Sequence, residues 1–551
     1  MTRLPIHEWF KFDNLSNFIA LFACVFSVLI VLYSLEFMKG KKNLASYYVY
    51  ILLTIAATMG ALFANNLIVF IVFWGFLAAL LYLLIDFGED EQRTYTAKKA
   101  FIIIGGTDAV MILGIALLYQ ITGTFKMDAM SVELGGSKAV WAYVCLAIGA
   151  LAKAGAMPVH TWVPDTAKDA PTPVTALLPA ALDKLLGIYF LARLTLDIFV
   201  MNFGMNIALM VIGSITIIAA VMMALVQHDF KRLLGYHAVS QVGYMVLGIG
   251  TGNPVGIAGG IFHMLNNAIY KSCLFLSAGA VEKKSGTSNL EKLGGFSTIV
   301  PISYITFLIA ALAISGVPPL NGFASKWMIY QGIIETGKDG GGLWMIWLIS
   351  AMFGSALTLA SFMKLTHAIY LGQPSPERAI KDNQKVGLAM NLPMIVLALL
   401  CIVFGIFATQ VPLKMFVLPA LGLEVEFTGA WFAGIATLSI IAGIVIGALI
   451  YWMGSFKTMR TTEAFIGGLD IKSNPEMRVS GTEFYNTIKE LSFLKTMYKM
   501  AEKKVFDIYE VGKSLTFGFN SILKVLHTGV LNTYLAWCLI GMIILFFIIV
   551  R

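Results

Sequence analysis

The sequence predicts an all-α polytopic membrane protein with about 14 transmembrane helices. Hydrophobic residues make up 58% of the 551-residue chain and charged residues only 13%, whereas a soluble domain is about 45–50% apolar and about 25% charged. Mean hydropathy is +0.81. The apolar residues form long unbroken runs near the roughly 20 residues that cross a bilayer as a helix. Because barrel strands would be short and alternating, these runs also exclude a transmembrane β-barrel.

Reading the chain for such runs gives the individual transmembrane helices, with boundaries good to a few residues. In chain order they are 17–38, 46–64, 66–86, 98–121, 139–157, 172–196, 203–227, 234–251, 255–281, 301–336, 343–371, 386–410, 429–453 and 530–550. The stretch 301–336 contains Pro318, Pro319 and Gly322, which predicts a broken helix. Lipid tolerates a broken helix only where the freed backbone lines a polar cavity or is buried in protein.

Two short segments of the sequence resemble each other. Residues 152–158 (AKAGAMP) and 313–319 (AISGVPP) are both small-residue helices broken by proline. Each lies in the fourth span of a five-span block, and an odd number of spans inverts the second copy, as in many transporters. The predicted domains are an N-terminal helix (1–45), a first five-helix repeat (46–196), a second, inverted repeat (203–371), two additional helices (386–453), a lateral segment (454–529) and a C-terminal anchor (530–551).

Charge in the loops predicts orientation. Most loop Lys and Arg residues fall on one side of the membrane, which the positive-inside rule makes cytoplasmic, so the N-terminus lies outside. The segment 454–529 places eleven more Lys and Arg on the cytoplasmic side. From about 481 to 527 its apolar residues recur at spacings of three, four or seven, which predicts a basic amphipathic helix along the membrane surface. Unbroken, it would reach roughly 70 Å, enough to contact a neighbouring subunit.

The chain offers few residues for cofactors or enzyme chemistry. Its five cysteines lie in apolar stretches without a CxxC pair, so we expect small apolar side chains there and no iron–sulfur cluster. The cytoplasmic loops contain no phosphate-binding loop, no metal-ligand spacing and no nucleophile constellation. No cleavable signal peptide is evident. A membrane enzyme with its own active site is therefore the least favoured class.

Ionisable residues inside the predicted spans are the main functional signal. Each costs about 2.5–3.5 kcal/mol to insert, so it marks a functional site by default. A lysine in a desolvated bundle gives up its proton more readily, and its charge then responds to a neighbouring charge. The alternative is structural ion pairing, as between the adjacent Asp183 and Lys184. The set is Asp108, Lys153, Asp183, Lys184, His237, His263, Lys271, Lys326, Lys364 and His367.

Four segments carry a resemblance to a known family. They are 152–180 (AKAGAMPVHTWVPDTAKDAPTPVTALLPA), 227–245 (QHDFKRLLGYHAVSQVGYM), 261–281 (IFHMLNNAIYKSCLFLSAGAV) and 316–327 (GVPPLNGFASKW). In this order they resemble the antiporter-like subunits of respiratory complex I, multisubunit sodium/proton antiporters and energy-converting membrane-bound hydrogenases. The resemblance covers roughly residues 12–453. The sequence of residues 179–193 (PAALDKLLGIYFLAR) resembles most the archaeal hydrogenase and its sulfur-reducing relatives within this family.

The resemblance implies residue roles. Lys153 matches the central lysine of the first half-channel and Lys326 that of the second. Lys271 and His263 match the axis that connects them, and Lys184 falls one position before the usual bridging residue. The proton path would therefore comprise Lys153, Lys184, His263, Lys271 and Lys326. Asp108 and Asp183 are candidate counter-ions, and His237, Lys364 and His367 are candidate exit or accessory residues. No metal-binding or cofactor-binding residue is expected.

The chain also departs from the family pattern. Trp74-Gly75 stands where the family has tryptophan followed by the glutamate that pairs with the first-channel lysine, so Asp108 would have to replace it. Asn267 stands where a second histidine is often found. Residues 12–16 (FDNLS) match the opening of the family's third helix, so two N-terminal helices are missing or belong to another chain. The tail, a lateral helix followed by a final span, resembles that of the family members at the distal end of such complexes. In those members the lateral helix braces adjacent subunits.

These observations predict an ion-translocating subunit of a membrane-bound, redox-driven respiratory complex that moves protons or exchanges sodium for protons. Clusters, nickel or quinone would reside only in partner subunits, which include other antiporter-like subunits. The few in-span acids slightly favour protons over sodium. One alternative is a non-pumping structural subunit that braces the membrane arm; another is a stand-alone carrier, against which the lateral helix argues.

Overall fold

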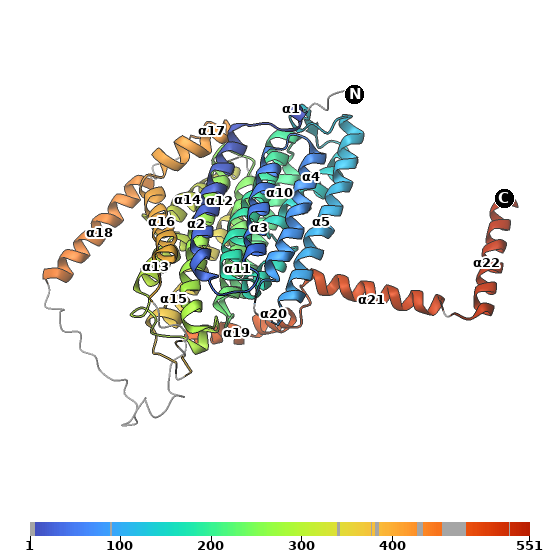
Figure 1. The fold of residues 1–551 in the computed structure, drawn as a ribbon. Coiled ribbons are helices and arrows are strands. Elements are labelled where there is room, and N and C mark those ends of the chain that lie inside the picture. Colours follow the sequence, from blue (N-terminus) through green and yellow to red (C-terminus); the bar gives the residue numbers. More distant parts are fainter. Residues whose placement is uncertain are drawn as a thin grey trace. The chain divides into compact units, whose positions relative to one another are not determined.

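The fold is a bundle of membrane-length helices. The computed structural model describes residues 6–88, 91–338, 342–375, 377–378, 380, 385–426, 433–453, 481–527 and 529–550 (Figure 1). The first part of the predicted lateral segment, 454–480, lies outside the described residues. The chain divides into two compact units, Met1–Leu494 and Lys495–Arg551.

The first unit begins with the predicted N-terminal helix and the first predicted repeat. The N-terminal part is α1 (Ile6–Trp9) and α2 (Asn14–Phe37). The repeat comprises α3 (Leu44–Phe63), α4 (Leu67–Ile85), α5 (Arg93–Thr122), α6 (Ser137–Ala154), α7 (Trp162–Asp169), α8 (Thr172–Leu177) and α9 (Asp183–Arg193). The π-helical turns η2 (Leu178–Leu182) and η3 (Leu194–Ile198) join α8 and α9 into one span and extend it. A two-residue parallel pair, β1 (Val132–Glu133) with β2 (Phe199–Val200), ties two loops together.

The second repeat and the additional helices follow. They are α10 (Phe203–Leu225), α11 (Phe230–Gly250), α12 (Pro254–Ser285), α13 (Pro301–Ser315), α14 (Asn321–Thr336), α15 (Trp344–Thr366), η5 (His367–Leu371), α16 (Leu388–Ile406), η6 (Thr409–Val417), α17 (Leu418–Leu421) and α18 (Ala433–Met453). Short 3₁₀ turns are η1 (Met127–Ala129), η4 (Leu290–Lys292) and η8 (Gly481–Glu483).

Every predicted span coincides with a helix. Ten helical segments of the described chain are long and apolar enough to cross a membrane. The other predicted spans correspond to α11 and α12, which carry many polar side chains, to the broken pair α13 and α14, and to α18. The prediction of a helix broken within 301–336 is confirmed, because α13 ends at Ser315 and α14 begins at Asn321.

Asp and Asn side chains set where several helices begin. Asp13, Asn66, Asn202, Asp229 and Asn253 each accept a hydrogen bond from a backbone N–H in the first turn of α2, α4, α10, α11 and α12. An N-cap of this kind satisfies an N–H that has no partner within the helix. The cap on α11 begins that helix four residues before the apolar run, so Lys231 and Arg232 lie within its first turn.

The two broken helices end in the same backbone motif. At the end of α6, the N–H of Gly155 and that of Ala156 both bond to Leu151 O, at 2.9 and 2.8 Å. At the end of α13, Gly316 occupies the same position, and the N–H of Val317 bonds to Leu312 O at 3.0 Å. Both glycines have positive φ, +87° and +82°, as the residue after a helix does in this type of C-cap.

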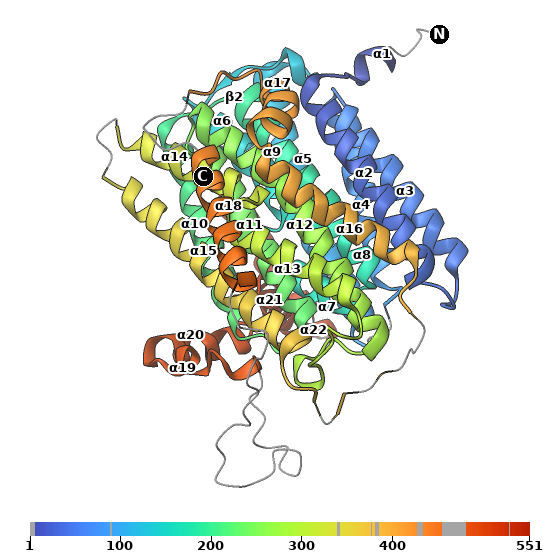
Figure 2. The same ribbon diagram turned by 90° about the vertical axis from the view of Figure 1, so that its left-hand side faces the viewer.

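The long helix α12 lies at the centre of the bundle. It packs against α11, α14, α13, α16 and α8, and most of its side chains are buried. Figure 2 shows α2, α3 and α4 along one side of the bundle and α10, α14 and α15 along the other. Gly213 of α10 and Gly243 of α11 face each other so closely that a Cβ on either would lie within 2.7 Å of backbone. Such small-residue contacts are how membrane helices achieve tight packing.

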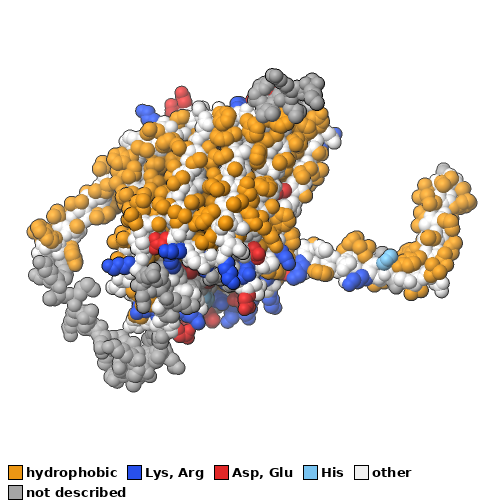
Figure 3. Space-filling view, in the orientation of Figure 1, with side chains coloured by type: hydrophobic (Ala, Val, Ile, Leu, Met, Phe, Trp, Pro, Cys, Tyr) orange, Lys and Arg blue, Asp and Glu red, His pale blue; other side chains and the backbone are white. Residues whose placement is uncertain are grey.

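Charge separates the two ends of the bundle. Lys and Arg side chains gather at one end of the broad apolar band, and fewer lie at the other (Figure 3). We call the first the basic end. Its assignment to the cytoplasm stays a prediction from the positive-inside rule.

The lateral segment corrects one prediction. Instead of one helix over 481–527, the chain forms α19 (Asn486–Glu490), α20 (Ser492–Glu502) and α21 (Ile508–Leu526). Lys504 has a positive φ of 58°, and the Asp507 carboxylate caps α21 by accepting from Tyr509 N at 3.1 Å. The amphipathic period continues across this break, so the periodicity alone did not reveal it. The final helix, α22 (Leu531–Val550), matches its prediction.

Candidate functional site

Nearly all the ionisable residues singled out from the sequence are buried. Asp108, Lys153, Asp183, Lys184, His237, His263, Lys271, Lys326 and Lys364 are all buried. His367 differs: it is half-buried and its ring packs against Phe484. The structure therefore places His367 at the bundle surface, apart from the other nine.

Trp74 joins a lysine and a carboxylate in the first repeat. The Lys153 ammonium donates to Trp74 O at 3.1 Å and lies 4.8 Å from the centroid of its ring. On its other edge, Trp74 Nε1 donates to Asp108 Oδ1 at 2.9 Å. A Cβ on Gly75 would lie 4.0 Å from Asp108 Oδ2, so the position lacking the expected glutamate directly faces the Asp108 carboxylate.

A second carboxylate interacts with two lysines. Asp183, at the start of α9, interacts electrostatically with both Lys153 and Lys184. Its Oδ2 has no hydrogen-bond partner within the described residues, although the atom is buried. The Lys184 ammonium donates to Ala154 O at 3.0 Å. That carbonyl lies at the end of α6, where helix carbonyls lack intrahelical partners and the helix dipole is negative, so a cation is stabilised there.

The residues predicted to connect the two half-channels, Lys271 and His263, lie on α12. The Lys271 ammonium donates to Leu234 O at 2.9 Å and is within electrostatic reach of Lys184. One turn before Lys271, Asn267 contacts Ala180 O at 3.5 Å through its amide nitrogen, while its Oδ1 has no partner in the described chain. Lys271 therefore extends the charged series of the first repeat into the second.

His263 is held by three neutral polar groups. Its Nδ1 lies 2.9 Å from Ser325 Oγ, and its Nε2 lies 3.1 Å from Gln241 Oε1 and 3.2 Å from the Tyr270 hydroxyl. Sequence reasoning missed Gln241, Tyr270 and Ser325, because it selected only ionisable side chains. Helical spacing contained a signal, since Gln241 lies four residues after His237 and Tyr270 seven after His263.

At the second break, no carboxylate of the described residues contacts the lysine. The Lys326 ammonium donates to Ile314 O at 2.8 Å and lies 4.6 Å from the centroid of the Tyr244 ring. Ile314 O, like Ala154 O, belongs to the last turn of a broken helix. Thus Lys184 and Lys326 make similar contacts in the two repeats, each with a carbonyl of the last helical turn before the break. The sequence comparison had instead matched Lys153 with Lys326.

Two of the predicted accessory residues, His237 and Lys364, bind neutral partners. His237 Nε2 lies 2.7 Å from Ser361 Oγ. The Lys364 ammonium, one turn further along α15, donates to Leu225 O at 2.7 Å and Gln227 O at 2.9 Å. These carbonyls lie at the end of α10 and in the loop that follows.

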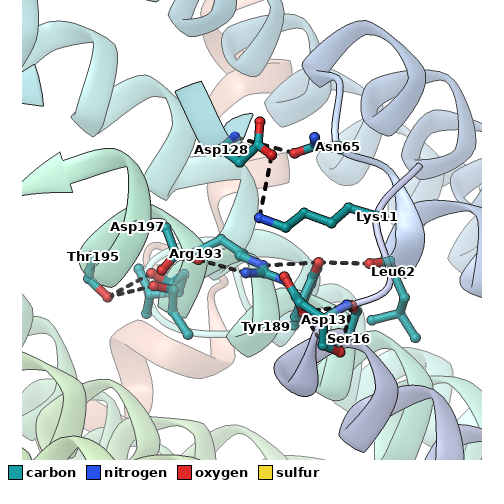
Figure 4. A network of polar contacts seen from close by, with 12 residues as sticks. Lys11, Asp13, Ser16, Leu62, Asn65, Asp128, Tyr189, Arg193, Thr195 and Asp197 are labelled. Atoms are coloured by element: carbon teal, nitrogen blue, oxygen red, sulfur yellow. Dashed lines mark hydrogen bonds and ion pairs between the residues drawn. The ribbon is translucent and has the colours of Figure 1, made fainter. Parts of the chain in front are cut away.

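A separate polar network lies at the other end of the bundle (Figure 4). Arg193 pairs with Asp13 and, at 2.7 Å, with Asp197, and its Nε donates to the Tyr189 hydroxyl at 3.1 Å. The residues line a cavity of about 560 Å³. Burial raises the pKa of Asp13, but the Ser16 N–H and the Arg193 guanidinium outweigh it and hold that pKa below its usual value of 3.8.

The described residues contain no group of three His, Cys, Asp or Glu side chains placed to hold a metal ion. The buried groups are instead a series of proton donors and acceptors with few anions. Such a series exchanges protons more readily than it binds a multivalent cation, because hard cations require several carboxylate or carbonyl oxygens.

Comparison with known proteins gives the family and the fold. Residues 64–358 match the family described as NADH:quinone oxidoreductase/Mrp antiporter, TM. The chain is 32% identical over 462 residues to Na(+)/H(+) antiporter subunit A1 of Staphylococcus epidermidis, covering 77% of this chain and 57% of that protein. It is 33% identical over 417 residues to the subunit of the same name in Staphylococcus aureus, covering 72% and 52%. The chain thus spans about half the length of these curated relatives.

Two solved structures share the fold. One is the Mrp complex from Dietzia sp. DQ12-45-1b, with a TM-score of 0.69 and 23% identity, covering 75% of this chain and 84% of that chain. The other is the membrane-bound sulfane sulfur reductase, an archaeal respiratory membrane complex, with a TM-score of 0.80 and 22% identity, covering 97% and 89%. The family match and the apolar helices establish a multi-pass membrane protein.

Proposed function

The chain belongs to the NADH:quinone oxidoreductase/Mrp antiporter transmembrane family, and from this premise we propose that it is an ion-translocating subunit of a redox-driven membrane complex. It moves protons, or exchanges sodium for protons, along Lys153, Lys184, Lys271, His263 and Lys326. One observation carries the proposal: a buried, electrostatically linked series from Lys153 through Asp183 and Lys184 to Lys271 crosses from one repeat into the other.

Coupling along this series is electrostatic. At an effective dielectric constant near 20, two unit charges about 4 Å apart interact by roughly 4 kcal/mol. A proton that arrives on one lysine therefore changes the free energy of protonating the next by an amount that decides its charge. Carbonyls at the ends of α6 and α13 stabilise the protonated forms of Lys184 and Lys326. Neither contact prevents release of the proton, because a carbonyl is not itself a charged partner.

Asp108 acts as the counter-ion of Lys153 in place of the expected glutamate. The support is geometric: Gly75 leaves room beside the Asp108 carboxylate, and Trp74 contacts both partners. An aromatic residue between them keeps the carboxylate from forming a direct, tight ion pair. The lysine is thereby biased towards its charged form without being locked in it.

The partners and orientation follow the same proposal. The chain operates beside other membrane subunits, some of them antiporter-like, which hold the clusters, nickel or quinone that drive the process. This chain contributes no cofactor. The basic end faces the cytoplasm, together with the lateral segment, and the N-terminus lies outside. The sulfane sulfur reductase fold match covers nearly the whole chain, tail included, and supports a place in such a complex.

Replacing Lys326 by Ala in the intact complex tests the function. Pumping, measured as ions moved per electron transferred, should fall at least tenfold while assembly is retained, because the second break then has no group to carry the proton. Lys338→Ala is the matched control, since Lys338 is an exposed lysine just after α14. Full pumping by Lys326→Ala at normal turnover would overturn the proposal.

Gly75, in place of the expected glutamate, and the long tail favour a second candidate function. In that case the chain is a non-pumping structural subunit that braces the membrane arm. Lys153→Ala and Lys326→Ala would then leave the ion stoichiometry unchanged, whereas deletion of 481–551 would disassemble the complex. The two functions therefore predict opposite results for the same two lysine variants.

A further inference from the structure

His237 is buried with half of its ring unpartnered. Its Nε2 lies 2.7 Å from Ser361 Oγ, whereas its Nδ1 has no hydrogen-bond partner among the described residues. A buried polar atom without a partner is uncommon and calls for an explanation, such as a bridging water or a functional role. The proposed axis does not use this histidine.

One side of His237 faces the axis. Lys271 donates to Leu234 O, which lies one helical turn before His237 on α11. The imidazole is within electrostatic reach of both Lys271 and Lys326. Phe362 packs against the ring, with centroids 4.9 Å apart, and also lies 5.7 Å from the Lys271 ammonium. The histidine is thus beside the axis lysines, with an aromatic wall on one face.

The other side leads to the basic end. Ser361 and Lys364 are three residues apart on α15, so both lie on one face of that helix. The Lys364 ammonium uses two of its three hydrogens on Leu225 O and Gln227 O. The loop continues directly to His228, whose side chain is about half exposed. Lys364 therefore lies between the buried histidine and the bundle surface.

No ion pair accounts for these residues. Neither His237 nor Lys364 contacts a carboxylate in the part of the chain that is described; their partners are a hydroxyl and two carbonyls. Structural charges in membrane helices are normally paired with opposite charges. A lysine, a serine and a histidine in a row, without an anion, are instead suited to passing a proton.

We propose that Lys364, Ser361 and His237 form a branch that carries protons between the basic end and Lys271. Neutral Lys364 takes a proton from water. Through a bridging water, the Ser361 oxygen accepts a proton from Lys364 as its own hydrogen passes to His237 Nε2. His237 then releases its Nδ1 hydrogen through a bridging water to the neutral amine of Lys271. One proton moves in each step; rotation returns the Ser361 hydroxyl to its first orientation, and exchange of the His237 Nε2 hydrogen for one on Nδ1 through bridging water returns the imidazole to its first tautomer. The inference rests on the proposed function and adds the place where the axis is loaded.

Two variants in the intact complex test the branch. Lys364→Arg keeps the positive charge and the donors to both carbonyls, but a guanidinium does not release its proton in proteins. His237→Gln keeps a polar group beside Ser361 but cannot carry a proton through its ring. Each should lower proton uptake at the basic end at least tenfold, with normal assembly. His228→Gln, on the neighbouring loop, is the matched control and should leave uptake unchanged.

The outcomes separate the branch from the function as a whole. Loss of uptake in Lys364→Arg and His237→Gln, with assembly intact, supports the branch. Normal uptake in both, together with loss of pumping in Lys326→Ala, overturns the branch and leaves the proposed function standing. Normal pumping in all three overturns both. Ser361→Ala removes a single hydroxyl and guards against misfolding: a drop in uptake with an unchanged melting temperature supports the relay, and unchanged uptake contradicts it.

Discussion

The two broken helices have the same backbone and different charges around it. α6 and α13 end in the same glycine C-cap, and a lysine ammonium donates to a carbonyl of the last turn in both. Around the first break lie Asp108 and Asp183, whereas Lys326 at the second has a carbonyl and the Tyr244 ring. Repetition of a backbone motif therefore does not repeat its electrostatics, and the two halves of the axis should respond differently to the same kind of substitution.

The largest expected effect is at Asp183. Asp183→Asn removes the carboxylate shared by Lys153 and Lys184, and stranding a buried charge costs about 3 kcal/mol or more. The melting temperature of the purified subunit or complex should fall clearly. Asn321→Asp provides the contrast: it adds a carboxylate at the second break, where the Asn321 side chain has no hydrogen-bond partner within the described residues. If Asp183→Asn is neutral, the first break does not depend on its carboxylates.

The next effect distinguishes the two glycines. Gly155→Ala and Gly316→Ala both place a Cβ at positive φ, which costs about 1–2 kcal/mol. At Gly155 the new Cβ would also lie 2.7 Å from Val163 Cγ2, whereas at Gly316 it would meet the flexible Lys326 Cδ at 3.1 Å. Gly155→Ala should therefore destabilise more, as measured by thermal unfolding in detergent. The reverse order would show that the second break is the more tightly packed.

The proposed role of Asp108 can be tested by moving its carboxylate to position 75. Asp108→Asn should reduce pumping several-fold, a change of about 1 kcal/mol, because Lys153 then loses one of its two carboxylates. Gly75→Glu on its own would place a second carboxylate beside Asp108. The double variant, Gly75→Glu with Asp108→Asn, should restore pumping, since it returns a single carboxylate to the same space. Absence of any restoration would mean that Asp108 does not stand in for the expected glutamate.

The smallest effect concerns the network at the end opposite the basic end. Asp13 has a lowered pKa, so its contribution to stability is fully present above its usual pKa of 3.8 and is lost as the pH falls through the lowered value. Because the group is partly exposed, Asp13→Asn should cost only about 0.5 kcal/mol at pH 7. The difference in stability between the two proteins should be constant from pH 7 to pH 5 and vanish at lower pH. A difference that grows on acidification would contradict this ion pair.

Local features of the fold were predictable. Hydropathy and length located the spans, and glycine and proline located both breaks, because these properties act within a few residues. The helix N-caps explain why one predicted span is shorter than its helix. Asp229 caps α11 before the apolar run begins, whereas the predicted span starts at that run and leaves out Lys231 and Arg232. The prediction of one lateral helix over 481–527 was wrong for the opposite reason. Its amphipathic period continues past Lys504, although a cap at Asp507 interrupts the backbone.

The sequence by itself determined which residues are costly inside a membrane, and nine of the ten ionisable side chains selected on that ground lie buried in the bundle. Only the tertiary structure decided their partners. Lys184 rather than Lys153 donates to the end of α6, Trp74 joins Lys153 to Asp108, and neutral Gln241, Tyr270 and Ser325 hold His263. The physical reason is that burial follows from composition along one helix, whereas a hydrogen-bond partner is selected by how helices distant in the chain pack together.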